Sequence, residues 1–281
     1  MNASAPAKDP TGFYVAALRA LQKAGVPFLV GGAYALERYT GVCRDTKDLD
    51  VFVHPRDSAL ALRALGAAGY STELTFAHWL GKAFSGDDVI DIIFSSGNGC
   101  ATVDDEWFAH AVEATVLGVS VELCPPEEMI WSKGFIMERE RYDGADVAHL
   151  LRADAERLDW RRLLRRFGRH WRVLFSHLVL FGFIYPAERG RIPSWVMEAL
   201  ARRLGEESRR DAPSDPVCCG TLLSRAQYLV DVDTWGYRDA RLVGPASMTE
   251  DEVAEWTAAI EGPPPTATGV VGQDHAAGSD R

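Results

Sequence analysis

The chain has 281 residues, of which 47% are hydrophobic and 25% charged, and its formal net charge is -10. This composition is typical of a soluble globular protein, and the length suits one large domain or two of ordinary size. The longest apolar run, residues 171–185, contains polar side chains and is too short to span a bilayer, and residues 1–12 lack the apolar core of a secretory signal. We therefore expect a cytoplasmic protein that does not enter a membrane.

The charge is unevenly distributed. Residues 1–150 carry 12 Lys and Arg against 21 Asp and Glu, whereas residues 152–172 hold eight arginines against three acids. The acidic body argues against a general coat for nucleic acid. Apolar residues are interleaved in the arginine-rich stretch, which favours the solvated basic face of a core helix. The alternative is a basic surface that binds an RNA or nucleotide acceptor.

The cysteines and histidines do not indicate a metal site. The five cysteines lack C-x-x-C spacing, and the seven histidines include no H-x-x-x-H pair.

Hydrophobic periodicity and turn residues predict the elements in chain order. The expected strands are 27–30, 48–53, 70–76, 78–84, 87–94, 114–116 and 119–123. The expected helices are 13–24, 33–39, 58–69, 104–111, one beginning at 125, 143–152, 159–182, 194–204, 222–230 and 249–261. The shift to helical patterns after residue 150 predicts two domains, 12–150 and 151–261, between a disordered lead (1–11) and a disordered tail (262–281).

Three features of the first domain suggest a site for nucleotide and metal. A short apolar strand ends in Gly31 and Gly32 and leads into a helix, so that backbone N–H groups can face a phosphate; a plain tight turn is an equal alternative. Asp48 and Asp50 lie on one face of the next strand, because alternate side chains of a strand share a face. Asp91 interrupts a later aliphatic strand and would be costly there without a cation or hydrogen-bond donors. Three carboxylates form the kind of oxygen-rich set that Mg²⁺ prefers. The alternative for Asp48 and Asp50 is that they lie on a solvated edge strand and bind nothing.

The order of these motifs resembles the DNA polymerase beta-type nucleotidyltransferase superfamily. The resemblance covers about residues 13–150 and rests on the glycine pair, the R-x-T-x-D-x-D pattern at residues 44–50 and the isolated Asp91. This pattern is similar to that of the minimal bacterial nucleotidyltransferases, including those that act as toxins or in phage defence. The resemblance implies an α/β (α+β) nucleotidyltransferase domain with a mixed sheet, followed by a mainly α-helical C-terminal domain.

The resemblance also implies roles for particular residues. Gly31 and Gly32 would contact the triphosphate, Asp48 and Asp50 would hold Mg²⁺, and Asp91 would complete the triad and take the proton of the acceptor hydroxyl. The defence-type relatives have a lysine after the sheet and an aspartate about a dozen residues later. Lys133 fits that arrangement with Asp143 or Asp146, and an ordinary surface lysine with Asp143 as a helix cap is an equal alternative. Arg44 and Lys47 flank the acids and could serve the phosphates or balance the charge.

Taken together, these features predict an enzyme that uses two Mg²⁺ ions to move an NMP group from an NTP to a hydroxyl of a small molecule, a protein or an RNA. The alternative is a non-catalytic nucleotide- or RNA-binding module with the same fold. A toxin role would add an antitoxin partner. The base preference, the acceptor and the oligomeric state do not follow from the sequence.

Overall fold

The computed structural model describes residues 10–44, 46–244 and 247–259 of the chain. The predicted lead and tail therefore fall almost entirely outside the described residues; of the lead, Pro10 and Thr11 are described, and they begin the first helix. No helix in the described part is long and apolar enough to cross a membrane.

A seven-stranded mixed sheet organises the first half of the chain, with strand order β3-β4-β5-β2-β1-β7-β6. Strands β2 and β5 pair in parallel, as do β1 and β7, and the other neighbours are antiparallel. The strands are β1 (Leu29–Val30), β2 (Asp48–Phe52), β3 (Ser71–Phe76), β4 (Leu80–Ser85), β5 (Asp88–Ile93), β6 (Val112–Val116) and β7 (Val119–Leu123). All seven predicted strands are confirmed, with ends shifted by one or two residues.

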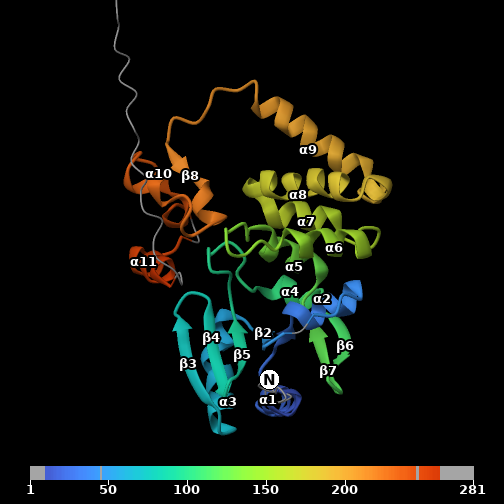
Figure 1. The fold of residues 1–281 in the computed structure, drawn as a ribbon, viewed down its shortest axis with the longest axis vertical. Helices are drawn as coiled ribbons and strands as arrows, with labels where there is room; N and C mark the ends of the chain where they lie inside the picture. The colour runs from blue at the N-terminus through green and yellow to red at the C-terminus, as the bar shows by residue number, and fades with distance from the viewer. Residues whose placement is uncertain (1–9, 45, 245–246, 260–281) are drawn as a thin grey trace, which may run out of the picture.

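Helices flank this sheet where apolar residues recur at helical spacing. Helices α1 and α3 pack together on the sheet, with α3 against β3, β4 and β5, and α2 leads toward the helical half of the chain through its contacts with α6 (Figure 1). Gly41 ends α2 in the left-handed conformation with φ 71°, as predicted for a glycine cap. The helices of this half are α1 (Thr11–Lys23), α2 (Gly32–Thr40), α3 (Ser58–Ala67), α4 (Asp105–Ala109) and α5 (Pro126–Gly134).

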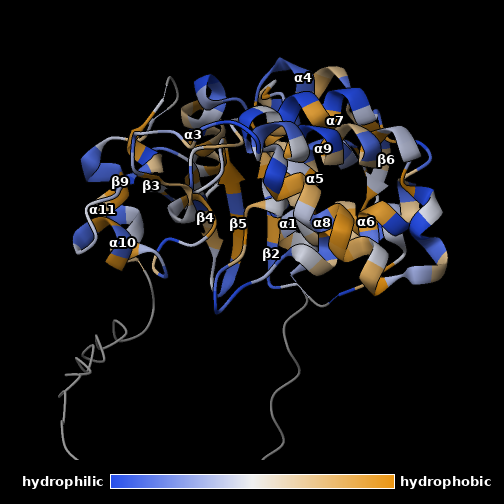
Figure 2. Ribbon diagram, turned by 90° about the horizontal axis from the view of Figure 1, so that it is seen from above, coloured by the Kyte–Doolittle hydropathy of each residue, from blue (hydrophilic) through white to orange (hydrophobic). Residues whose placement is uncertain are grey.

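The alternation of β2 places its two classes of side chain on opposite faces. Leu49 and Val51 are fully buried in the core, together with Val53 just beyond the strand, whereas Asp48 and Asp50 between them are only partly buried. Apolar residues also run along β4, β5 and α8 (Figure 2). The predicted display of both aspartates on one face is therefore confirmed.

The second half is mainly helical, and it differs from the prediction in two places. Its helices are α6 (Gly144–Asp154), α7 (Trp160–Phe167), α8 (Trp171–Ile184), α9 (Ser194–Glu207), α10 (Leu229–Asp233) and α11 (Glu250–Ala258). Short 3-10 turns lie at Pro55–Asp57, Gly168–His170, Pro186–Arg191, Cys219–Leu222 and Ala240–Leu242, and a small parallel pair joins β8 (Val217–Cys218) to β9 (Arg238–Asp239).

The first difference is that the predicted helix 159–182 is two helices. Gly168 has φ 47°, which a right-handed helix cannot accommodate, so α7 ends there and α8 starts after one 3-10 turn. The apolar spacing continues on both sides of the break, and periodicity alone therefore concealed it.

The second difference is that the predicted helix 222–230 is wrong. Tertiary contacts hold this segment in turns: the backbone N–H of Met137 donates to Leu223 (3.1 Å), and that of Arg225 donates to Glu138 (3.4 Å). Only α10 at its end is helical. A capping box begins the last helix, with Thr249 and Glu252 bonded reciprocally at the start of α11.

Candidate active site

Most of the predicted site residues line one cavity of about 510 Å³. Sheet residues and the start of α2 form one wall, α5, α6 and the loop between them form another, and residues 221–225 with α11 form a third. The lining includes eight of the ten candidate site residues, namely Gly32, Arg44, Asp48, Asp50, Asp91, Lys133, Asp143 and Asp146. Gly31 and Lys47 are not in the lining.

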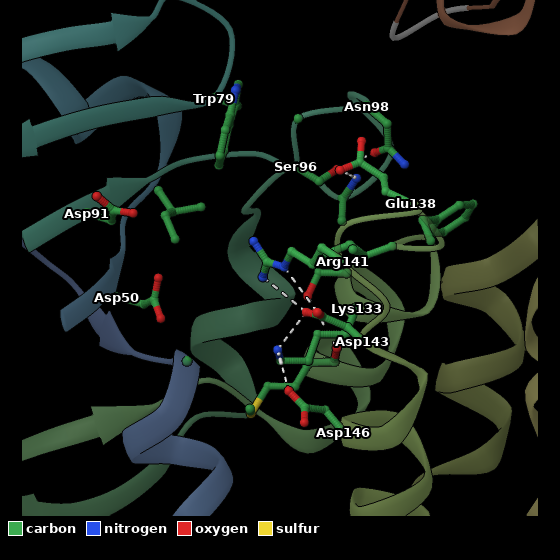
Figure 3. A pocket seen from close by; sticks show the side chains of 18 of the residues that line it. Asp50, Trp79, Asp91, Ser96, Asn98, Lys133, Glu138, Arg141, Asp143 and Asp146 are labelled. Carbon is green, nitrogen blue, oxygen red and sulfur yellow. Dashed lines mark hydrogen bonds and ion pairs between the residues drawn. The ribbon is translucent and has the colours of Figure 1, made fainter. Parts of the chain in front are cut away.

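Asp50 and Asp91 face the cavity from adjacent strands. They occupy the same register position of the parallel pair β2 and β5, so the two carboxylates emerge side by side (Figure 3). Asp48 lies two residues before Asp50, at the start of β2, where its carboxylate accepts a hydrogen bond from the Thr46 hydroxyl at 2.6 Å. The structure therefore places Asp91 on the same cavity wall as Asp48 and Asp50, which lie about forty residues earlier in the sequence.

The glycine pair is shaped around these acids. Gly32 begins α2 with φ 53°, and a Cβ atom on it would lie 1.6 Å from the Asp50 carboxylate. A Cβ atom on Gly31 would lie 2.3 Å from the ring of Phe52, and the Gly31 N–H already donates to the Asp50 carbonyl at 3.0 Å. Only glycines permit this close approach of the helix start to β2.

Nearby cations compensate the charge of Asp50 only in part, because Lys133 and Arg141 lower its pKa less than its surroundings raise it. None of the described residues donates a hydrogen bond to it, and burial with repulsion from Asp48 and Asp91 raises its pKa to about 7. Burial also raises the pKa of Asp91, although Lys82 opposes the shift. A carboxylate that is costly to ionise in the folded chain is a group that a cation would stabilise.

Asp91 is engaged by a residue that sequence reasoning missed. Lys82, its register partner on antiparallel β4, places its ammonium nitrogen 2.7 Å from an Asp91 oxygen. No three His, Cys, Asp or Glu side chains in the described ranges stand close enough to hold a metal ion as they lie. Asp50, Asp48 and Asp91 have the oxygen chemistry for Mg²⁺, and Asp91 would exchange Lys82 for the ion.

Lys133 faces the acids from the helical side. Its side chain is 15% exposed, and its ammonium nitrogen lies 2.9 Å from Asp143 and 2.8 Å from Asp146, so both of the aspartates left open by the sequence contact it (Figure 3). Burial would lower the pKa of Lys133, but these two carboxylates raise it, and the lysine stays charged. Arg44 also contacts Asp146, at 2.5 Å, and Arg141 forms two hydrogen bonds of 3.0 Å to Asp143.

Known proteins offer a comparison that is independent of this geometry. No protein-family model and no curated protein matches the chain. Among solved structures it is similar to the antibiotic-resistance factor ANT(2'')-Ia, with 16% identity and a TM-score of 0.38, over 70% of this chain and 94% of that one. It is also similar to the lincosamide antibiotic adenylyltransferase LnuA (16% identity, TM-score 0.37, 51% of this chain and 96% of that one).

A third similar structure is an antigenic nucleotidyltransferase-like protein from Paracoccidioides brasiliensis (15% identity, TM-score 0.44, 66% of this chain and 94% of that one). The structures that this chain resembles include nucleotidyltransferases. Because the three TM-scores lie below 0.5 and the identities below 25%, the chemistry of the site is inferred from its own residues.

The arginine-rich stretch does not reach the cavity. Arg162 and Arg166 are buried: Arg162 pairs with Glu127, and Arg166 pairs with Glu128 at 3.0 Å and with Asp104 at 2.6 Å. These contacts join α7 to α5 and α4. The two central arginines thus hold helices together and belong to neither a solvated face nor a nucleic-acid cradle.

Proposed function

We propose that the chain transfers an NMP group from an NTP to a hydroxyl of an acceptor, with Mg²⁺ bound by Asp48, Asp50 and Asp91. One observation carries the proposal: the Asp50 carboxylate, to which no described residue donates a hydrogen bond, lies against Gly32 at the start of α2 and in register with Asp91, inside a cavity of nucleotide size. Bound Mg²⁺ would neutralise the charge that develops on the triphosphate.

The phosphates have a defined place in this arrangement. The first turn of α2, beginning at Gly32, presents backbone N–H groups and the positive end of the helix dipole. Lys133 approaches from the opposite wall and Arg44 from the segment before β2, and Asp146 contacts both of them. Asp143 and Asp146 hold the ammonium group of Lys133 toward the cavity and so orient it for a phosphate oxygen.

Asp91 is suited to accept the proton of the attacking hydroxyl. Its pKa is raised from the ordinary value by burial, which makes the carboxylate a stronger base. In the reaction the acceptor oxygen would bond to the α-phosphorus of the NTP, the bond to the β-phosphate oxygen would break, and pyrophosphate would leave. Asp91 would hold the released proton.

The alternative is a module that binds nucleotide without turnover. The Lys82–Asp91 ion pair favours it, because an Asp91 permanently held by Lys82 could serve neither metal nor proton. The two functions differ in one measurable respect: only the enzyme releases pyrophosphate.

The test measures NTP affinity by calorimetry with Mg²⁺ and pyrophosphate release over a panel of acceptors, for the wild type and Asp91→Asn. We expect Asp91→Asn to retain NTP binding and to lose about 100-fold or more in turnover, the contribution of a general base. Asp87→Asn, in the exposed turn before β5, removes an equal charge outside the cavity and should change neither quantity. Equal turnover in Asp91→Asn and the wild type would contradict the role of Asp91. If the wild type bound NTP and released no pyrophosphate with any acceptor, the binding module would be the correct function.

A further inference from the structure

The end of the cavity beyond Asp91, opposite Gly32, has a composition of its own. Trp79 precedes β4 on the sheet side, further along the strands than Asp91, and Ser96, Asn98 and Glu138 line the same end (Figure 3). Since the phosphates are assigned to the α2 side and the base to Asp91, this end is where the acceptor would sit. We call it the acceptor end.

The C-terminal part of the chain closes the acceptor end. Trp256 of α11 packs edge-on against Trp79, with ring centroids 5.0 Å apart, and against Phe76 at 5.1 Å. A Cβ atom on Gly97 would lie 2.4 Å from the Trp256 ring, so the glycine permits this docking. Both indoles line the cavity.

A second segment of the C-terminal part completes the wall. The Asn98 amide donates to the Leu222 carbonyl at 2.7 Å, and Arg225 contacts Glu138 at 3.1 Å while its guanidinium lies 4.2 Å from the Trp256 ring. Residues 221–225 are thereby tied to the sheet, to the loop after α5 and to α11. These contacts fix the wall of the acceptor end on three sides.

The charge of the cavity also discriminates between acceptors. Its lining has seven acidic residues against four basic ones, and Arg225 and Arg141 are engaged by Glu138 and Asp143. An RNA acceptor would bring phosphates next to these acids without arginines to receive them. The arginines of the stretch 152–172 do not line the cavity. Arg162 and Arg166, at the centre of this stretch, form buried ion pairs with Glu127 and Glu128.

We infer that the acceptor is a small, neutral or cationic molecule that presents a hydroxyl to Asp91 and packs against the indoles of Trp79 and Trp256. The inference rests on the proposed function and narrows it, because it selects a small molecule over RNA and protein. Indole rings offer an apolar face and a negative quadrupole, both of which favour carbon-rich or cationic groups over phosphates.

Label transfer tests the inference directly. The full-length protein is incubated with Mg²⁺ and NTPs radiolabelled on the α-phosphate, together with the small-molecule, RNA or protein fraction of a cell extract. We expect label in the small-molecule fraction. Label in RNA or protein, or in none of the fractions while calorimetry detects NTP binding, would overturn the inference and leave nucleotide binding intact. Failure to bind NTP with Mg²⁺ would instead overturn the proposed function.

A variant series links the acceptor to the indoles. Trp256→Ala should raise the KM for the labelled acceptor about tenfold or more, in line with the loss of one stacking contact, and leave NTP affinity within about twofold. Trp256→Phe should restore most of the loss. Trp235→Ala, which removes a 65% exposed indole outside the cavity, is the matched control. An unchanged KM in Trp256→Ala, with a circular dichroism spectrum like that of the wild type, would refute the role of this wall.

Discussion

At the scale of single residues, Asp50 is the most informative group of the site. Its ordinary pKa of 3.8 rises to about 7 in the folded chain. Between these values the folded protein holds a proton that the unfolded chain has lost, so the free energy of unfolding falls as pH rises from about 4 to about 7 and then levels off. The groups that act on Asp50 are the repelling Asp48 and Asp91 and the attracting Lys133 and Arg141.

Asp50→Asn should therefore stabilise the metal-free protein at pH 8 and have little effect near pH 4. The gain is at most about 4 kcal/mol, since one pKa unit corresponds to about 1.4 kcal/mol. Urea unfolding with EDTA at the two pH values measures it, with Asp87→Asn as the control. Mg²⁺ should raise the melting temperature of the wild type at pH 8 and not that of Asp50→Asn. Equal stabilisation by Asp50→Asn at both pH values would contradict the raised pKa.

At the scale of elements, α2 brings Gly32 against Asp50. The glycines at its two ends allow the cost of backbone strain to be compared with the cost of a steric clash. Gly32 and Gly41 both have positive φ, 53° and 71°, but a Cβ atom on Gly41 meets nothing within 4 Å, whereas one on Gly32 meets Asp50. Gly41→Ala should cost about 1 kcal/mol, the penalty of a left-handed backbone for alanine.

Gly32→Ala adds the clash and should cost more, and it should also abolish NTP binding with Mg²⁺ because the Asp50 carboxylate must move. Thermal unfolding and calorimetry on the two variants measure these effects side by side. If Gly32→Ala bound NTP as well as Gly41→Ala, the first turn of α2 would not be the phosphate site.

The elements also show how far the sequence could be read. Alternation in β2 and the glycine cap of α2 are local signals, so the face shared by Asp48 and Asp50 followed from the residues alone. The register of Asp50 with Asp91, and of Lys82 with Asp91, depends on which strands become neighbours, which no local pattern encodes.

Two of the remaining misses have the same physical origin. The turns at 222–230 are fixed by hydrogen bonds to residues more than 80 positions away, which override a helical pattern. Trp256 reaches Trp79 across 177 positions, and only the folded chain reveals that it lines the cavity. The Gly168 break had a local signal, a glycine within the apolar spacing, but the pattern on either side concealed it.

At the scale of the whole molecule, Lys133 connects the helical half to the carboxylates of the sheet. It is nearly buried between Asp143 and Asp146, and it faces the Asp50 carboxylate across the cavity. Its positive charge lowers the pKa of both Asp50 and Asp143. Removal of this charge would leave buried carboxylates uncompensated.

Lys133→Met should lower the free energy of unfolding by about 3 kcal/mol, the typical cost of breaking a buried pair, and weaken NTP binding about tenfold or more. Lys47→Met removes the same charge from an exposed position outside the cavity lining and should change stability by less than about 0.5 kcal/mol. Urea unfolding and calorimetry on both variants compare a lysine that faces the acids with one that merely precedes them in the sequence. If Lys47→Met weakened NTP binding as much as Lys133→Met, the general field of the protein, and not the contact between its two halves, would hold the triphosphate.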